Sequence, residues 1–359
     1  MKKTAQIIGL SFLLCRNFSC AEQKVPSSKA EKTTAVASSA QQPLRFSSAI
    51  MAIHRDRSGN YWLASHKEGV CRYNGKSVEY FTVDQGLADN QVRSIQEDQL
   101  GRIYFGTAQG VCRYEQGKII RLVENSWEPA LKEKDFGQFD LWFNADTKEG
   151  AYCYDGEKLS YWAFPLGDKR DVNNAYALTD FSRGKNGALY WATYAAAFIY
   201  EGQGVQRIDN ETLGLKKEEG LHIRSILKDS KGRLWIGNNG IGVLLMQGDT
   251  VLNFSREKGL LMPMEAFREN TEKRAFTKNK GLQSVFLIVE DQKGNIWFSD
   301  RDTDLWRFDG KNIQNYKITE NDAPSMPLSF YEEENGILLF GLSNGKVYQF
   351  DGQSFQERF

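Results

Sequence analysis

The feature that most constrains this chain is a 23-residue motif that repeats along its length. Each clear copy has an acidic turn ending in Gly, an apolar segment centred on an aromatic residue, a polar corner and a second apolar segment. The clear copies are HRDRSGNYWLASHKEGVCRYNGK (54–76), QEDQLGRIYFGTAQGVCRYEQGK (96–118), LKDSKGRLWIGNNGIGVLLMQGD (227–249) and VEDQKGNIWFSDRDTDLWRFDGK (289–311). Weaker copies lie at 181–203 and 331–353, and another at 138–158 has Phe139 in place of its first glycine. A period of about 40 to 50 residues indicates a repeat architecture.

Within each unit the apolar residues alternate with a period of two, which indicates β-strands rather than helices. The second repeat shows this in its runs VRSIQED, RIYFGT, GVCRY and KIIRL, which predict four strands. Asp-x-x-Gly separates the first two strands, and Asn-Gly or Asp-Gly pairs separate the last two. Both are hairpin signals because these residues tolerate positive φ.

Four antiparallel strands repeated seven times predict an all-β, seven-bladed β-propeller over residues 44–359, because radial blades leave few open sheet edges. One residue of each unit stands at the centre of its second strand, and its strict recurrence predicts a core position between blades. These residues are Trp62, Tyr104, Trp142, Tyr190, Trp235, Trp297 and Leu339. The sequence leaves open how the ring closes, since Leu44 to Phe46 can add an edge strand or remain in the preceding segment.

The repeats resemble the two-component regulator propeller family, whose pattern runs Gly-Leu, Val-x-x-Ile, Asp-x-x-Gly, Leu-Trp-Ile-Gly-Thr and Gly-Leu. The segments QGLADNQVRSIQEDQLGRIYFGTAQGV, EGLHIRSILKDSKGRLWIGNNGIGV and KGLQSVFLIVEDQKGNIWFSDRDTDL carry this resemblance, and the third, fourth and seventh units depart from it. The resemblance implies a periplasmic sensing module, often for oligosaccharides. Phosphotransfer is not implied, because the sequence has no kinase segment.

Two motifs that suggest chemistry have the wrong context for it. The glycine-rich stretch that ends at Gly242 precedes no helix and lacks the Lys-Ser/Thr of a phosphate-binding loop. The segment GLSNG, which contains Ser343, matches the Gly-x-Ser-x-Gly motif of a hydrolase nucleophile elbow, but it aligns with a strand-to-strand corner of the repeat. Only three histidines occur in the chain, which further disfavours a hydrolase.

The N-terminus predicts export. Residues 1–20 have two lysines before a short apolar run, as in a signal peptide, with either cleavage after Ala21 or lipidation of Cys20. Residues 21–43 are rich in Ser, Ala and Lys and predict a flexible tether. We therefore expect a bacterial protein in the periplasm or anchored at the outer membrane, touching a membrane only through a lipid.

The charge balance and the cysteines limit which partners and bound groups are expected. Lys plus Arg and Asp plus Glu both number 46, so no global field favours nucleic acid. Cys71 and Cys112 occupy one repeat position and Cys153 lies one step along, so these thiols are expected to be buried and free. No cofactor is expected, and the best candidate for a Ca²⁺ or Mg²⁺ site is DRDTD, with Asp300 and Asp302 as ligands.

Ligand-binding residues are expected on the face where the second-to-third strand corners and the blade-to-blade linkers emerge, since loops on a rigid frame carry function. Arg93, His222 and Arg224 are expected near the central channel. The ligand-binding candidates are His66, Lys67, Arg93, Trp127, Asn144, Tyr194, Arg224, Asn238, Asn239 and Arg301. Trp162 and Tyr176 are further candidates for stacking on a ligand.

Two linkers are longer than ring closure requires, 124–138 and 256–281. The second predicts a short helix with Met264, Phe267, Thr271 and Ala275 along one stripe. It acts either as a lid over the channel or as a plain surface insertion.

The expected function is therefore a monomeric, non-catalytic binding or sensing propeller for a small molecule, a glycan or an envelope protein. One alternative is a scaffold that holds envelope proteins through an apolar patch on its exposed linkers. The other is a lyase, since streptogramin lyases are propellers with related repeats. That activity needs a catalytic His near a carboxylate-bound magnesium, and His66 with Glu68 is the only loosely suitable pair.

Overall fold

Each repeat folds into its own antiparallel sheet, and consecutive strands of a repeat are neighbours in that sheet. The computed structural model describes residues 44–124, 131–167, 175–184, 187–216, 219–248, 250–272, 281–318 and 325–359. The strands of the first four sheets are β1 (Ile50–Arg55), β2 (Tyr61–Ser65), β3 (Val70–Tyr73), β4 (Val78–Phe81); β5 (Val92–Glu97), β6 (Ile103–Thr107), β7 (Gly110–Glu115), β8 (Lys118–Arg121); β9 (Leu141–Asn144), β10 (Gly150–Tyr154), β11 (Leu159–Ala163); and β12 (Leu178–Arg183), β13 (Leu189–Thr193), β14 (Ala197–Tyr200), β15 (Val205–Ile208).

The last three sheets each have four strands. They are β16 (Ile223–Lys228), β17 (Leu234–Asn238), β18 (Gly242–Gln247), β19 (Thr250–Asn253); β20 (Val285–Glu290), β21 (Ile296–Asp300), β22 (Asp304–Phe308), β23 (Ile313–Tyr316); and β24 (Pro327–Glu332), β25 (Leu338–Leu342), β26 (Val347–Phe350), β27 (Phe355–Glu357). The helices are η1 (Val83–Gln85), η2 (Glu133–Asp135), α1 (Phe254–Glu257) and α2 (Met264–Glu272). The predicted helix in the long linker is confirmed by α2.

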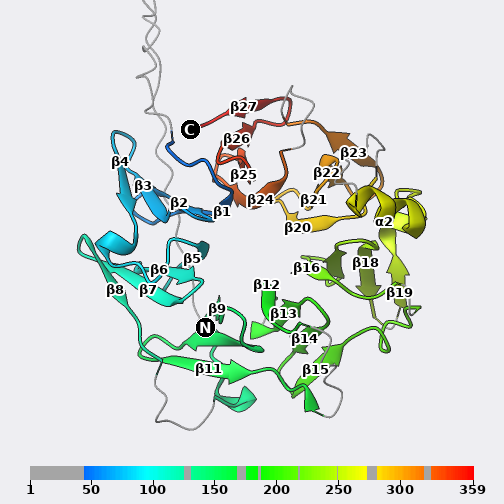
Figure 1. Ribbon diagram of the computed structural model, residues 1–359, viewed down its shortest axis with the longest axis horizontal. Coiled ribbons are helices and arrows are strands. Elements are labelled where there is room, and N and C mark those ends of the chain that lie inside the picture. The colour runs from blue at the N-terminus through cyan, green and yellow to red at the C-terminus, as the bar shows by residue number, and fades with distance from the viewer. Residues whose placement is uncertain are drawn as a thin grey trace, which may run out of the picture. The chain divides into compact units, whose positions relative to one another are not determined.

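The seven sheets form a ring in which the first strand of a blade packs against the first strand of a neighbouring blade (Figure 1). Such contacts join β12 to β16, β16 to β20, and β20 to β24, and β1 with β24 closes the ring. The protein is a seven-bladed β-propeller, as the repeats predict. The core consists of the layers between blades, where the central aromatic residues are buried as expected.

The third blade differs from the others, because it has three strands among the described residues and β9 is its inner strand. Two side chains from neighbouring blades cover the inner edge of β9. Gln96 donates from Nε2 to the Trp142 carbonyl (2.6 Å), and Arg183 donates to the Gln138 and Asp140 carbonyls (2.7 and 2.5 Å). Backbone acceptors at this edge are therefore satisfied without a fourth strand.

The ring closes through side chains and not through an exchanged strand. Residues 44–46 are not assigned to a strand, and Phe46 is buried in the layer between the last and first blades. Ser329 Oγ donates to the Ile50 carbonyl (2.8 Å), and the Tyr61 hydroxyl donates to Glu333. The Phe359 ring packs edge-on against the Tyr61 ring at 5.4 Å.

The turn acid and the central aromatic residue of a repeat are one structural unit. Asp229 accepts hydrogen bonds from the Lys231 and Arg233 amides (3.0 and 2.8 Å) and from Trp235 Nε1 (2.8 Å). Asp291 makes the same contacts below Trp297. The carboxylate therefore fixes the tight turn and satisfies a buried indole N–H at once. Gly232, at φ 77°, completes this turn.

Other expectations about single residues are also confirmed. Cys71, Cys112 and Cys153 are buried free thiols. Ser343 lies in the corner between β25 and β26, where no helix follows. Gly242 has φ 74°, and a Cβ there would lie 2.6 Å from the Leu282 carbonyl oxygen, so this glycine permits a close backbone approach. No helix within the described ranges is long and apolar enough to span a bilayer.

Candidate functional site

A register shift marks the same place on six innermost strands. In each of them the first residue pairs with the last residue of the second strand, and the next residue bulges out of register. Bulges re-aim side chains and are frequent next to binding sites. The bulged residues, which we call the inner rim, are Met51, Arg93, Thr179, Arg224, Phe286 and Leu328. The inner rim therefore lies at the end of the blades where the second-to-third strand corners emerge.

One side of the inner rim is centred on Arg93. Its guanidinium donates to the Asn144 amide oxygen and, at 3.2 Å, to Asp146 Oδ1. Asn144 in turn donates to the Leu178 carbonyl, so this chain of contacts joins the second, third and fourth blades where the third blade is thinnest. Arg93 and Asn144 therefore have structural contacts here, whatever ligand role they also have.

His66 lies on the same side, in the corner after β2. Burial lowers the pKa of His66, and the neighbouring positive charges of Lys67 and Arg93 lower it further. Glu68, its suggested catalytic partner, instead accepts hydrogen bonds from the Ser47 and Ser48 amides, both at 2.9 Å. Burial alone would raise the pKa of Glu68, but these bonds outweigh it and hold the pKa below its usual range. Glu68 therefore anchors the segment that enters β1.

The opposite side of the inner rim is centred on Arg224. Its guanidinium lies between the rings of Tyr194 and Phe286, each centroid 4.8 Å away. The Tyr194 ring also packs against the His222 ring at 5.2 Å. Burial lowers the pKa of His222, and the charge of Arg224 adds to this effect. Three of these side chains were singled out from the sequence, and the fold brings them together.

Three polar atoms in the residues of this part of the ring are buried and have no hydrogen-bond partner within the described structure. They are Arg224 Nε, Asn239 Oδ1 and Ser284 Oγ. Asn239 and Ser284 face each other in an isolated β-bridge, and Asn239 Nδ2 lies 3.5 Å from His222 Nδ1. Leaving such a group unpaired costs about 1–3 kcal/mol, so three in one place call for water or a ligand.

Sequence reasoning missed Ser284 and Phe286. The available signal was the alignment itself, because Phe286 occupies in the sixth repeat the place that Arg224 occupies in the fifth. We call the cluster of Tyr194, His222, Arg224, Asn239, Ser284 and Phe286 the Arg224 site.

Two other candidates hold the corners of their own blades. Asn238 and Asp300 end the second strands, and their partners in register are Ile223 and Val285. Asn238 Oδ1 accepts from the His222 amide (3.2 Å), and Asp300 Oδ2 accepts from the Ser284 amide (2.7 Å). Burial raises the pKa of Asp300 to about 6, partly offset by hydrogen bonds from backbone amides.

The suggested cation ligands are both engaged. Asp300 Oδ1 accepts from the Asp302 and Thr303 amides, at 2.9 and 3.1 Å. Asp302 forms a two-point ion pair with Arg301, at 2.9 and 2.8 Å. The described parts of the chain contain no group of three or more His, Cys, Asp or Glu side chains placed to hold a metal ion. A cation at this corner remains a hypothesis.

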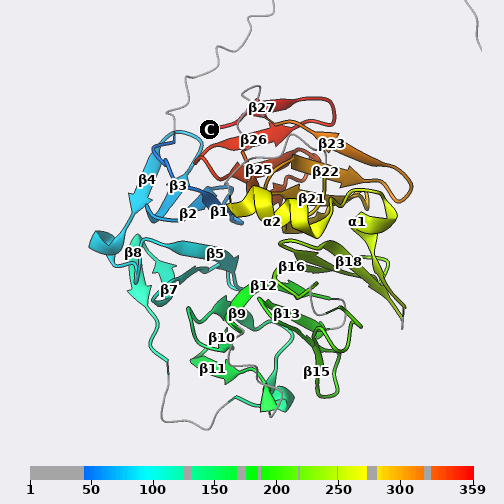
Figure 2. The same cartoon turned by 45° about the vertical axis from the view of Figure 1, so that its right-hand side comes forward.

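The helix α2 packs over the corners of the fifth and sixth blades and not over the middle of the ring (Figures 1 and 2). Its Phe267 is buried, lies within 4 Å of the Cβ position of Gly240, and has the Arg301 guanidinium 5.7 Å from its ring centroid. Met264 packs against the core layer between the fourth and fifth blades. The side chain of Thr271 and all of Ala275 lie outside the described residues.

Two further aromatic candidates, Trp162 and Tyr176, give no ligand platform. Trp162 and Tyr176 are buried, at 5% and 1% exposure, in the layer between the third and fourth blades. The expectation that they stack on a ligand is wrong, because they fill the core beside the thin third blade. Trp127 and Cys20 lie outside the described residues.

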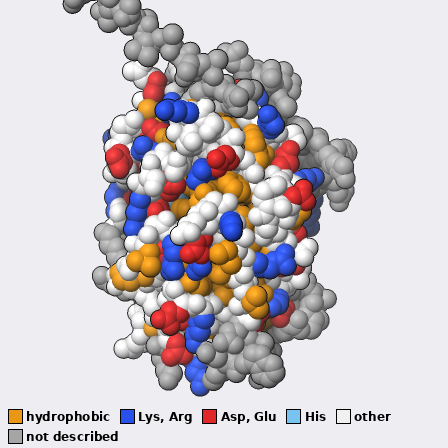
Figure 3. Space-filling view, turned by 90° about the vertical axis from the view of Figure 1, so that its left-hand side faces the viewer, with side chains coloured by type: hydrophobic (Ala, Val, Ile, Leu, Met, Phe, Trp, Pro, Cys, Tyr) orange, Lys and Arg blue, Asp and Glu red, His pale blue; other side chains and the backbone are white. Residues whose placement is uncertain are grey.

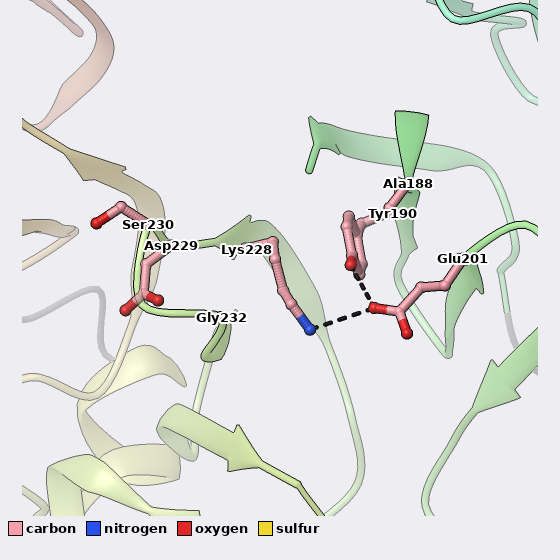
Figure 4. Close-up of a pocket in the computed structure, with 7 residues that line it drawn as sticks. All are labelled: Ala188, Tyr190, Glu201, Lys228, Asp229, Ser230 and Gly232. Carbon is pink, nitrogen blue, oxygen red and sulfur yellow. Dashed lines mark hydrogen bonds and ion pairs between the residues drawn. The ribbon is translucent and has the colours of Figure 1, made fainter. Parts of the chain in front are cut away.

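A separate pocket of about 290 Å³ opens near the opposite end of the blades, between the fourth and fifth (Figure 4). Lys228 Nζ and the Tyr190 hydroxyl both donate to Glu201 Oε1, at 3.2 and 2.5 Å. Lys228 and Glu201 are thus paired with each other. The pocket lies by the strand-to-strand turns, away from the Arg224 site.

Comparison with known proteins agrees with this architecture. Residues 86–109 and 218–240 match the family described as two component regulator propeller. The chain contains two component regulator propeller repeats. These segments hold the corners after β6 and β17, and the second includes His222, Arg224 and Asn239 of the Arg224 site. No curated protein sequence matches the chain significantly.

Solved structures with the same fold include two bacterial classes. The extracellular domain of a putative hybrid two component system from B. thetaiotaomicron has a TM-score of 0.61 at 19% identity, and the match covers 85% of this chain and 39% of that one. Virginiamycin B lyase from Staphylococcus aureus has a TM-score of 0.60 at 14% identity, covering 84% and 94%. At these identities the likeness shows the propeller fold, and this chain spans about two fifths of the length of the first of these structures.

Proposed function

We propose that this chain is an exported binding propeller, without catalytic activity of its own, that holds a ligand at the Arg224 site. The observation that carries the proposal is the set of three unpaired buried polar atoms in the Arg224 site, which also contains two aromatic rings packed on Arg224. Binding sites typically combine apolar or aromatic walls with a few convergent polar groups. The Arg224 site has this composition, whereas in the pocket of Figure 4 Lys228 and Glu201 already form an ion pair with each other.

An oligosaccharide is the ligand class that best fits this proposal. Sugar rings pack their apolar faces on aromatic side chains and bond their hydroxyls to amide, hydroxyl and guanidinium groups. Tyr194 and Phe286 provide rings, and Asn239, Ser284 and Arg224 provide the polar atoms. The repeat family implies the same class. The extracellular domains among the structural neighbours support export, as does the N-terminal sequence.

A thermal-shift screen of the purified full chain against oligosaccharides tests the proposal. A ligand at 100 times its Kd adds about 2.7 kcal/mol to stability, which raises the melting temperature measurably. The shift should disappear in Tyr194→Ala and persist in Lys228→Ala, which alters the pocket of Figure 4. A panel with no stabilising saccharide, or a shift that survives Tyr194→Ala, would overturn the proposal.

A scaffold for envelope proteins is the second candidate, favoured by exposed apolar side chains in the second and third repeats. Leu100, Val123 and Phe139 are 77%, 81% and 61% exposed. Hydrophobic side chains also gather on the side of the ring that carries the outer strands of the first two blades (Figure 3). Retention of one protein from an envelope extract, lost in Leu100→Ser with Phe139→Ser, would favour this function over ligand binding.

A further inference from the structure

The carboxylates at the corner end of the blades are paired within the protein. Glu68 accepts from the Ser47 and Ser48 amides, and Asp146 accepts from Arg93. Asp300 accepts from backbone amides, and Asp302 is paired with Arg301. Negative charge near the inner rim is therefore already balanced by local donors.

Positive charge near the inner rim is not balanced in the same way. Arg224 forms no ion pair among the described residues, and its one polar contact is Nη1 to the Tyr194 hydroxyl at 3.4 Å. Every other arginine named on this face has a carboxylate partner, Arg93 with Asp146 and Arg301 with Asp302. A half-buried guanidinium without a counter-ion is unusual, since buried charges are normally paired.

The setting of Arg224 also fixes how it can bind. Two rings pack against the guanidinium, each with its centroid 4.8 Å from Cζ, so the N–H groups bond best along the edge of the guanidinium plane. Arg224 Nε is buried and has no partner within the described structure. A planar guanidinium edge with two parallel N–H groups matches a carboxylate or a sulfate group in a two-point hydrogen bond.

We infer that the ligand carries an anionic group, a carboxylate or a sulfate, that binds the edge of the Arg224 guanidinium. This inference rests on the proposed function, because it identifies the chemistry of a ligand at the same site. It assigns Arg224 the role of recognising charge and Tyr194 and Phe286 the role of holding the guanidinium in its plane. A neutral oligosaccharide would leave the Arg224 charge unmatched.

Calorimetric titration of the full chain with matched saccharides tests this assignment. Trigalacturonate is compared with its methyl ester, and a sulfated trisaccharide with its desulfated form, so that the two members of each pair share their sugar rings and only one member carries the anionic groups. We expect one charged member to bind at least about 30-fold more tightly than its neutral partner, as for loss of a close charge pair. Which of the two it is distinguishes carboxylate from sulfate.

Variants locate the effect. Arg224→Gln should remove the preference for the charged saccharide, and Arg224→Lys should restore only part of it, since an ammonium keeps the charge but lacks the planar edge. Arg307→Gln is the matched control, because Arg307 also lies near two aromatic rings, Trp297 and Tyr316, but on the third strand of the sixth blade. It should bind as the natural chain does.

The outcomes separate the inference from the proposed function. Equal binding of charged and neutral saccharides, lost in Tyr194→Ala but not in Arg224→Gln, would overturn the inference and leave the function standing. Absence of binding by any saccharide would overturn both. Free sulfate binding as tightly as the sulfated sugar would retain an anion at Arg224 but contradict a saccharide ligand.

Discussion

The fifth and sixth blades differ from the third and fourth in how they hold their central aromatic residue. In the fifth blade Asp229 binds the turn amides and the indole of Trp235. In the third blade Phe136 occupies the place of that acid and packs edge-on against Trp142, with ring centroids 5.0 Å apart. The Trp142 indole N–H has no partner in the described structure. The repeat can therefore lose its polar anchor if an aromatic residue fills the space.

The contacts between blades divide the blades differently. In the second, sixth and seventh blades a glutamate at the end of the first strand accepts from the turn of the preceding blade, as Glu290 does from the Ser230 amide (2.6 Å) and Glu332 from the Gln292 amide (2.7 Å). The first, fourth and fifth blades have Arg55, Arg183 and Lys228 at this position. Lys228 forms an ion pair with Glu201 of the fourth blade, and both side chains line the pocket of Figure 4.

Removing the polar anchor from a regular blade should have the largest effect. Asp229→Ala leaves Trp235 Nε1, two turn amides and Arg233 without their buried acceptor, and should lower the free energy of unfolding by about 3 kcal/mol. Urea denaturation followed by tryptophan fluorescence measures this change. Asp309→Ala removes similar amide contacts from an exposed hairpin turn and should change stability far less. Equal effects would mean that the buried anchor contributes nothing special.

The repeat, and with it the ring, could be predicted from sequence because the turn acid, glycine and central aromatic residue are fixed by local geometry. The position of Arg224 near the inner rim followed from the same alignment. The thin third blade was not predictable, since Gln96 and Arg183 come from other blades to cover its edge. Burial of Trp162 depends on that same non-local packing. Ser284 was missed because an unpaired hydroxyl is a property of its surroundings and leaves no mark in the sequence.

A pair of conservative substitutions sharpens the comparison. Trp235→Phe and Trp142→Phe both remove a buried indole, at 0% and 2% exposure, but only the first breaks a hydrogen bond to a carboxylate. Trp235→Phe should therefore be more destabilising, by about 1–2 kcal/mol. The difference between the two urea midpoints isolates the N–H bond from the shared loss of ring volume. A larger cost for Trp142→Phe would contradict the role assigned to the turn acid.

The smallest expected effect concerns Asp180, which occupies on β12 the place where regular blades have Ser94, Ser225 or Ser329. The Asp180 side chain keeps some solvent-accessible area, but protein atoms surround its carboxyl group. This burial raises the pKa of Asp180 to about 6, although the Ile226 amide and the Ser225 hydroxyl donate to it (2.9 and 2.7 Å).

Because the folded state holds this proton more tightly than the unfolded state, Asp180 favours folding increasingly as the pH falls through 6 toward the unfolded pKa near 4. Between pH 7 and pH 5 the natural chain should gain about 1 kcal/mol over Asp180→Asn, measured as the difference in unfolding free energies at the two pH values. Asp351→Asn, in an exposed turn, should keep that gain. If Asp180→Asn gained as much as the natural chain, the Asp180 carboxyl would have the same pKa in the folded and unfolded states, which would contradict this prediction.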